Sequence, residues 1–306
     1  MPPKPDHPPI SITRRQALSW AAAAPLLMMR PALAAGDAAA APAGTARDVE
    51  YAHLERAHRR RLGVYAVDTA TGREVTYRAH ERFAFCSTFK AVLAGAILSQ
   101  DAAQPGLLDQ RILYTAHELA SYSPVTEKHV HGGMTIAQLC AAAIQYSDNT
   151  AANLLLHRLG GPRALTAYAR GLGNPTFRLD RFETALNTSI PGDERDTSTP
   201  ADMARTLETL VLGDALPPGA RARLKTWLLG NKTGDRRIRA AVPPGWQVAD
   251  KTGTGDYASA NDFGVIWPAD RPPVVLAIYT ASRDPHAKAD ESLIAEAARI
   301  ALAALA

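Results

Sequence analysis

Strand-like segments lie near both ends of this chain, whereas its long middle has the periodicity of helices. The stretch LGVYAVDTATGREVTYRA, residues 62–79, alternates apolar and polar positions around a Thr-Gly turn, which predicts a β-hairpin. Three more strands are predicted late, in WQVADKTGTG, NDFGVIWP and PVVLAIYTAS. Residues 87–229 are instead expected to form successive helices, with further helices at about 47–61 and at the C-terminal end. The expected fold class is α/β (α+β): one antiparallel sheet made by both ends, terminal helices packed on it, and an all-helical block between.

Two helix starts are visible in detail. Thr135 precedes the apolar pattern of TIAQLCAAAIQYS and is a candidate N-cap. Thr199, Pro200 and Asp202 supply a cap, a first-turn proline and an acid at the third helical position. Both helices fall within the predicted helical block.

The N-terminal segment has the features of an export signal. Arg14-Arg15 precedes an apolar run at 17–29, and Ala32-Leu33-Ala34 offers a small-x-small cleavage site. Paired arginines favour the twin-arginine route, so residues 1–34 are predicted to be a signal peptide of that type. An ordinary Sec signal with two chance arginines is the alternative. Residues 35–46, rich in Ala and Gly, are expected to be a flexible tether, and the mature protein is expected in the periplasm without membrane association.

Charge and cysteine content exclude several classes of protein. The formal charge of +4 comes mostly from residues 1–34, so the remainder is almost neutral and predicts no nucleic-acid partner. The two cysteines, Cys86 and Cys140, both lie in apolar helical patterns, which favours buried free thiols over a disulfide.

The apolar stretch FAFCSTFKAVLAGAIL contains one hydroxyl, Ser87, and one amine, Lys90, one helical turn later. A helix-capping serine with a lysine reaching to solvent is the simplest interpretation. However, a lysine among such apolar neighbours is costly unless its amine has partners. An amine beside a hydroxyl at a helix start could instead activate that hydroxyl as a nucleophile. The residues alone leave both interpretations open.

Two polar clusters follow at breaks in the helical pattern. Ser147-Asp148-Asn149 could simply be a turn or a helix cap. In RFETALN, Glu183 and Asn187 lie four positions apart and could hold one water between a carboxylate and a carboxamide. Arg181 and Asp196 bracket this loop, so an ion pair could close its neck, although exposed pairs contribute little to stability.

The tripeptide Lys251-Thr252-Gly253 falls on a predicted strand that is followed by a turn and a second strand. A lysine there would point its ammonium into a cleft, and glycine would allow a ligand to approach the backbone. A second Lys-Thr-Gly, at 232–234, follows a helix that ends in glycine and has no strand pattern. We interpret this copy as a loop outside the site.

Four motifs therefore occur in order: Ser-x-x-Lys, Ser-Asp-Asn, Glu-x-x-x-Asn and Lys-Thr-Gly. Together with longer stretches such as YSDNTAANLLL, RLDRFETALN and DKTGTGDY, they resemble the class A serine β-lactamases from about residue 47 to the C-terminus. The resemblance implies the β-lactamase/transpeptidase-like fold, with a five-stranded antiparallel sheet flanked by helices. It also implies a catalytic domain over 47–306, with an α/β subdomain from 47–82 and 230–306 and a helical subdomain over 83–229.

The resemblance further implies hydrolysis of β-lactam antibiotics through a serine acyl-enzyme, which gives antibiotic resistance. It implies a monomer that acts on small β-lactams, without a cofactor or a metal. The backbone N–H groups of Ser87 and Thr254 would form the oxyanion hole. Whether Lys90 or Glu183 removes the serine proton is left open. The implied catalytic residues are Ser87, Lys90, Ser147 and Glu183, and the implied substrate-binding residues are Tyr122, Asn149, Asn187, Lys251, Thr252, Gly253, Thr254 and Arg237.

Departures from the family pattern concern the cysteines and substrate breadth. Gly255 and Ala94 stand where the family's two common disulfides would place the partners of Cys86 and Cys140, so neither disulfide is expected. KTGTGDY resembles the branch active on oxyimino-cephalosporins, with Asp256 near the substrate side chain. Two rival functions are a D-Ala-D-Ala transpeptidase or carboxypeptidase, which would lack the Glu-Asn pair, and a penicillin-sensing receptor, which would need membrane helices.

Overall fold

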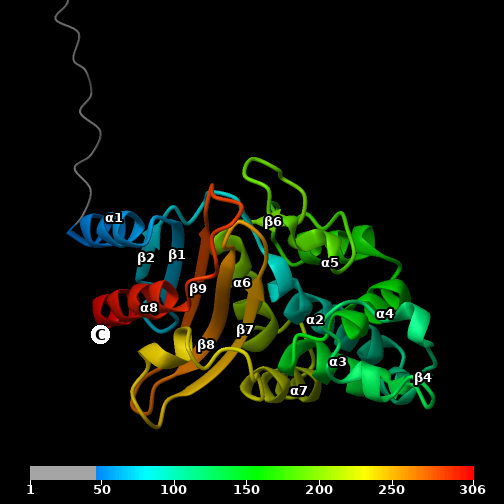
Figure 1. The fold of residues 1–306 in the computed structure, drawn as a ribbon. Coiled ribbons are helices and arrows are strands. Elements are labelled where there is room, and N and C mark those ends of the chain that lie inside the picture. Colours follow the sequence, from blue (N-terminus) through cyan, green and yellow to red (C-terminus); the bar gives the residue numbers. More distant parts are fainter. Residues whose placement is uncertain (1–45) are drawn as a thin grey trace, which may run out of the picture. The chain divides into compact units, whose positions relative to one another are not determined.

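A five-stranded antiparallel sheet lies at the centre of the computed structural model, which describes residues 46–306 (Figure 1). Its strand order, β2-β1-β9-β8-β7, brings the first two and the last three long strands together. The central strands β1, β9 and β8 are buried along almost their whole length, and most of their residues are apolar. The expectation of one sheet made by both ends of the chain is confirmed. The strands are β1 (Arg61–Asp68), β2 (Glu74–Tyr77), β7 (Gln247–Thr254), β8 (Ala260–Trp267) and β9 (Val274–Ala281).

The predicted hairpin is present with the predicted pairing. Val64 lies opposite Tyr77 and Ala66 opposite Val75. Gly72 occupies the turn with φ +71°, a conformation that glycine adopts at little cost. Local sequence therefore determined this part of the sheet.

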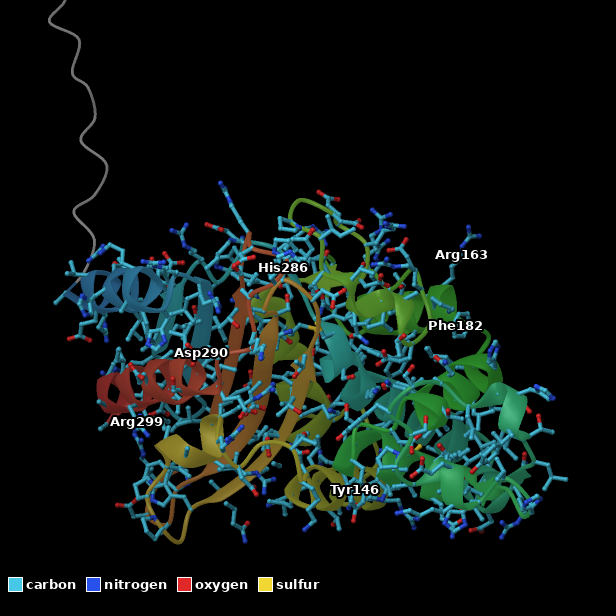
Figure 2. The ribbon with its side chains drawn as sticks, viewed as in Figure 1. Tyr146, Arg163, Phe182, His286, Asp290 and Arg299 are labelled. Carbon is cyan, nitrogen blue, oxygen red and sulfur yellow. The ribbon has the colours of Figure 1, made fainter. Side chains whose placement is uncertain are left out.

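Helices cover both faces of the sheet. On one face α1 (Ala46–His58) and α8 (Glu291–Leu305) pack against β1 and its neighbours, and their apolar side chains share a core with Val64, Leu276 and Ile278. The other face packs on α6 (Pro200–Val211), beyond which the remaining helices form the block seen to the right in Figure 1. Asp290 caps α8 and Arg299 lies further along it (Figure 2).

The helical block surrounds α2, whose residues Phe89 to Leu98 are all buried. The N-cap predictions are confirmed: Thr135 accepts a hydrogen bond from Gln138 N, and Thr199 from Asp202 N. The remaining helices are α2 (Phe89–Ala103), α3 (Ile136–Gln145), α4 (Asn149–Leu159), α5 (Pro162–Gly171) and α7 (Pro218–Leu229), with 3₁₀ turns η1 (Cys86–Thr88), η2 (Leu107–Asp109), η3 (Ala116–Glu118), η4 (Thr126–Lys128), η5 (Ala185–Thr188) and η6 (Ile238–Ala241), and short strands β3 (Phe83–Ala84), β4 (Arg111–Ile112), β5 (Met134–Thr135) and β6 (Thr197–Ser198).

Some details differ from the sequence predictions. The first helix ends at His58 rather than near 61, because Arg61 already pairs with β9. Cys86 and Cys140 are buried and free, as predicted. The predicted signal peptide and almost all of the tether lie outside the described residues. The division of the catalytic domain into two subdomains stays a prediction. No helix among residues 46–306 is long and apolar enough to cross a membrane.

Candidate active site

Ser87 lies in the 3₁₀ turn η1, directly before α2, rather than in the α-helix itself. Asn261 of β8 fixes this turn by donating hydrogen bonds to the carbonyl oxygens of Ala84 and Phe85, at 2.8 and 3.1 Å. The hydroxyl of Thr88 also bonds Phe85 O at 2.8 Å. The sheet and the start of α2 therefore hold the Ser87 hydroxyl in a fixed position.

Lys90 is fully buried, and its ammonium has three close partners. Its Nζ lies 2.9 Å from Glu183 Oε1, 2.8 Å from Ser147 O and 2.6 Å from Asn149 Oδ1. These contacts offset part of the cost of placing a charge in the core. Burial nevertheless lowers the pKa of Lys90, although the neighbouring carboxylate acts in the opposite direction. The interpretation of Lys90 as a solvent-reaching helix residue is therefore wrong.

The Ser-Asp-Asn motif forms the turn between α3 and α4. The carboxylate of Asp148 caps α4 through Ala151 N and accepts two hydrogen bonds from the backbone of Val125 and Thr126. The hydroxyl of Ser147 lies 3.1 Å from the ammonium of Lys251. Asp148 therefore stabilises the turn, and its neighbours Ser147 and Asn149 face the site.

The loop that carries Glu183 is closed at its neck as predicted. Arg181 Nε lies 2.6 Å from Asp196 Oδ2, and Asp196 is completely buried. Within the loop, Glu183 Oε1 accepts a hydrogen bond of 3.0 Å from Ser87 Oγ, and Oε2 accepts one of 2.5 Å from Asn187 Nδ2. Glu183 is therefore hydrogen-bonded directly to both Asn187 and the hydroxyl of Ser87.

Strand β7 brings the Lys-Thr-Gly motif against the nucleophile. A Cβ on Gly253 would lie 2.6 Å from Phe85 O and 3.1 Å from Ser87 N, so only glycine allows the two backbones to pass this closely. The buried Lys251 ammonium bonds Ser147 Oγ, and burial together with the charge of Lys90 places its pKa well below the usual value.

Arg237 does not lie on a strand. It precedes η6, in the loop after α7. From there its guanidinium donates to Gly253 O, Asn261 O and Thr254 Oγ1 at 2.7 to 2.8 Å, and its Nε lies 3.2 Å from Glu291. The arginine therefore fixes the end of β7 from a loop.

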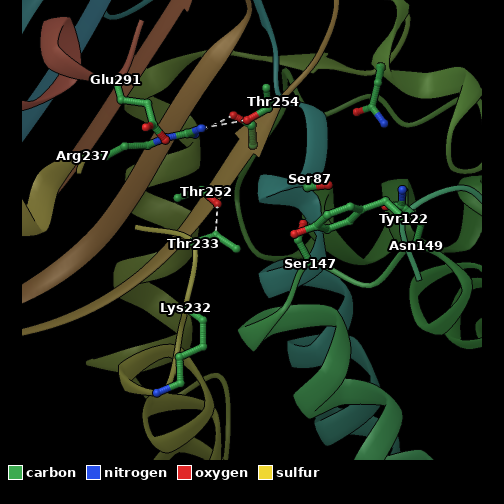
Figure 3. Close-up of a pocket in the computed structure, with 12 residues that line it drawn as sticks. Ser87, Tyr122, Ser147, Asn149, Lys232, Thr233, Arg237, Thr252, Thr254 and Glu291 are labelled. Atoms are coloured by element: carbon green, nitrogen blue, oxygen red, sulfur yellow. Dashed lines mark hydrogen bonds and ion pairs between the residues drawn. The ribbon is translucent and has the colours of Figure 1, made fainter. Parts of the chain in front are cut away.

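A cavity of about 530 Å³ lies between β7 and the nucleophile turn (Figure 3). Lys90, Glu183 and Lys251 do not line it; they lie buried behind its wall. Tyr122 stands at its edge with 62% of its surface exposed. The sequence-predicted residues that line the cavity are Ser87, Tyr122, Ser147, Asn149, Asn187, Arg237, Thr252, Gly253 and Thr254.

Comparisons with known proteins agree with this geometry. A family model described as the β-lactamase enzyme family matches residues 47–305. The chain is 53% identical over 256 residues to the carbapenem-hydrolyzing β-lactamase KPC of Klebsiella oxytoca, with 83% of this chain and 87% of that protein covered. It is 51% identical over 257 residues to β-lactamase CTX-M-8 of Citrobacter amalonaticus, with 83% and 88% covered. A crystal structure of a β-lactamase from Desulfarculus baarsii, 56% identical, matches with a TM-score of 0.84 over 85% of this chain and 97% of its own. This chain belongs to the class A β-lactamases.

As a class A β-lactamase, the protein hydrolyses β-lactam antibiotics and thereby gives antibiotic resistance. The resemblance found in the sequence and the five-stranded β-lactamase fold are both confirmed. Within residues 46–306 no group of three or more His, Cys, Asp and Glu side chains could hold a metal ion.

Sequence reasoning missed three residues of this β-lactamase's cavity. The second Lys-Thr-Gly does form a loop, but Lys232 and Thr233 line the cavity, so the expectation that this copy lies outside the site is wrong. The hydroxyls of Thr233 and Thr252 are hydrogen-bonded to each other. Glu291, in the first turn of α8, also lines the cavity and pairs with Arg237. An acid at a helix start was visible in the sequence, but it signals a cap as readily as a site.

The neck of the Glu183 loop gives a stability prediction. Asp196→Asn removes the charge of a buried ion pair, and such a loss leaves Arg181 without its partner. We expect the free energy of unfolding to fall by about 3 kcal/mol, with slower release of the acyl-enzyme. Chemical denaturation and pre-steady-state kinetics measure the two effects. Asp193→Asn, in the same loop but paired with Arg195 at the surface, is the control and should change stability little. Equal effects of the two substitutions would contradict the prediction.

Proposed function

We propose that Ser87 is the nucleophile of β-lactam hydrolysis and that Glu183 is the base in both half-reactions. The observation that carries this proposal is the 3.0 Å hydrogen bond from Ser87 Oγ to Glu183 Oε1. In acylation, the Ser87 oxygen bonds to the lactam carbonyl carbon while its proton passes to Glu183. The direct contact favours Glu183 over Lys90 as the acceptor. Lys90, bonded to the same carboxylate oxygen, holds that carboxylate in place.

The backbone N–H groups of Ser87 and Thr254 are proposed to donate to the carbonyl oxygen as it becomes negative. The close approach of Gly253 to Ser87 N supports this role, because it places the end of β7 beside the nucleophile turn. Each such donor contributes about 3–4 kcal/mol at the transition state.

Ser147 is proposed to pass a proton to the lactam nitrogen as its bond to the carbonyl carbon breaks. Its Oγ lies 3.1 Å from the Lys251 ammonium and 3.4 Å from that of Lys90. Two ammonium groups at this distance stabilise the hydroxyl oxygen while its proton is being transferred. Lys90 replaces the proton that Ser147 gives to the nitrogen and takes in return the proton that Glu183 received from Ser87, since its Nζ lies 3.4 Å from Ser147 Oγ and 2.9 Å from Glu183 Oε1. Glu183 is thereby ionised again before deacylation.

Deacylation is proposed to use a water held between Glu183 and Asn187. The Oδ1 atom of Asn187 is buried and accepts no hydrogen bond from residues 46–306, so it is available to one proton of that water. Glu183 removes the other proton as the water oxygen bonds to the ester carbon, and the Ser87 oxygen leaves with a proton returned by Glu183. The enzyme is then ready for another turnover.

The carboxylate of the lactam is proposed to bind at the end of the cavity that the side chains of β7 form. Thr252 and Thr254 supply hydroxyl donors there, Lys251 adds its charge from behind the wall, and Arg237 holds Thr254 in place. Asn149 and Tyr122 are proposed to contact the antibiotic side chain at the other rim.

The substrate range, the oligomeric state and the cellular location of the protein are also proposed. We propose penicillins and cephalosporins as substrates, and extension to oxyimino-cephalosporins with Asp256 near their side chain. The similarity to a carbapenem-hydrolyzing relative makes a carbapenem a necessary member of any substrate panel. We also propose that the protein acts as a monomer in the periplasm, after export by the twin-arginine route.

Turnover of a chromogenic cephalosporin tests the proposed mechanism. We expect many molecules of product for each molecule of purified enzyme. A single stoichiometric burst followed by a stable covalent adduct would contradict it, because a transpeptidase or a receptor behaves in that way. A parallel panel containing a penicillin, an oxyimino-cephalosporin and a carbapenem gives the substrate range.

Arg237→Ala tests carboxylate binding. We expect a KM for β-lactams that is about tenfold higher, because Thr254 loses its partner and a charge leaves the carboxylate end of the cavity. Stability should fall as well, since Gly253 O and Asn261 O lose a buried donor. Arg236→Ala is the matched control, because its side chain is 84% exposed and, within the described part of the chain, pairs only with Glu291. Unchanged kinetics in Arg237→Ala would remove this residue from the site.

A further inference from the structure

A second cavity, of about 910 Å³, shares no lining residue with the active site. Residues 189–194 of the Glu183 loop form one wall. Residues 59–61, where the chain enters β1, residues 81–84, and residues 281–284 at the end of β9 form the others. Nothing in the proposed mechanism uses this cavity.

The charges around this second cavity are unequally compensated. Its carboxylates are mostly paired with arginines: Glu55 with Arg78, Glu81 with Arg61, and Asp193 with Arg195. Glu194 lies 3.9 Å from Arg178, and only Asp284 has no cationic partner within the described part of the chain.

Four of the lining arginines have no carboxylate partner among residues 46–306. Arg60 and Arg82 donate only to backbone carbonyl oxygens and a threonine hydroxyl. Arg59 and Arg283 are exposed, and their side chains make no hydrogen bond or ion pair with residues 46–306. The cavity therefore has uncommitted positive charge and free guanidinium donors, which suit a carboxylate.

The same cavity also has an apolar wall. Phe83, Ala84, Pro191 and Ala281 line it, and so does Ile190, which is 46% exposed. A ligand that fits both features has an apolar body of aromatic or branched aliphatic carbon and one carboxylate.

The wall at 189–194 connects the cavity to the active site. Ser189 bonds the carbonyl oxygen of Asn187 and contacts the thiol of Cys86, the residue before the nucleophile. Asp256 N donates to the same Asn187 oxygen at 2.8 Å. A molecule that displaces Ile190 would therefore move the backbone that positions Asn187.

We propose that the second cavity binds a small organic carboxylate with an apolar body, and that its occupation changes the rate of deacylation. The proposal that a carboxylate binds depends only on the shape and the lining of the second cavity. The effect on rate rests on the role proposed above for Asn187.

Calorimetric titration with 4-phenylbutyrate tests the binding. We expect saturable binding to the wild-type enzyme, weakened about tenfold by Arg59→Ala and by Arg283→Ala, because each substitution removes one charged donor. Arg163→Ala, an exposed arginine that projects away from the protein in Figure 2, is the charge-matched control and should bind as wild type does. Arg237→Ala reports on competition from the active site and should also bind normally.

Three results would overturn the binding proposal: absence of saturable binding, equal binding by wild type and both lining variants, or loss of binding in Arg237→Ala alone. The rate effect is measured as kcat for a chromogenic cephalosporin with and without 4-phenylbutyrate. A change in kcat in wild type that disappears in the Arg59→Ala, Arg283→Ala double variant supports it. An unchanged kcat at saturating 4-phenylbutyrate contradicts it. A complete lack of turnover would count against the proposed mechanism and leave the calorimetric result intact.

Discussion

Ser87→Ala is expected to abolish both acylation and turnover, with a loss in kcat of about four orders of magnitude or more. The substitution removes the atom proposed to form the covalent bond, and the other polar groups of the cavity remain in place. The protein should keep its fold, because within residues 46–306 the serine side chain makes a single hydrogen bond, of 3.0 Å, to Glu183. Turnover of a chromogenic cephalosporin and the intact mass after incubation with a penicillin measure the two effects.

Ser99→Ala is the matched control for that substitution. Ser99 lies on α2, the helix that also carries Lys90, but it does not line the cavity. It should retain wild-type turnover and form no lasting adduct. A burst of product or a covalent adduct in Ser87→Ala would overturn the assignment of the nucleophile.

Glu183→Ala is expected to accumulate the acyl-enzyme. General-base catalysis by one side chain contributes about 10²–10⁴-fold, so kcat should fall by that order. Acylation should be slower but still detectable, because the strained lactam is reactive and Lys90 remains one helical turn from the nucleophile. Mass spectrometry after mixing with a penicillin should show an adduct that persists for many wild-type turnover times.

Glu194→Ala provides the control in the same loop. Its carboxylate is exposed and lies 3.9 Å from Arg178, so neither chemistry nor stability should change much. Unchanged turnover without an adduct in Glu183→Ala would remove this acid from the mechanism.

The elements that sequence predicts well are those that local chemistry determines. The hairpin around Gly72 and the caps at Thr135 and Thr199 depend on neighbours within a few positions, and all three are present. Each of the four motifs could be recognised because its residues are close together in the sequence. The order of the motifs then indicated the family. Ser87, Lys90 and Glu183 were expected to meet, and they do.

Contacts between loops that are distant in the chain could not be predicted from the sequence. The placement of Arg237 in a loop, the approach of Lys232 and Thr233 to the cavity, and the pairing of Arg237 with Glu291 depend on how α7, β7 and α8 pack. The hydrophobic periodicity of a segment does not indicate how that segment packs against distant ones. The second cavity is the same kind of feature, because its walls come from four separate segments.

The position of β9 in the sheet has a consequence for biosynthesis. Arg61 at the start of β1 lies opposite Ala281 at the end of β9, so the middle of the sheet closes only after nearly the whole chain has left the ribosome. A nascent chain must keep the apolar residues of β1 from aggregating until then. A premature stop codon ahead of β9 would remove the neighbour of both β1 and β8, so truncated products should be degraded rather than retain partial activity.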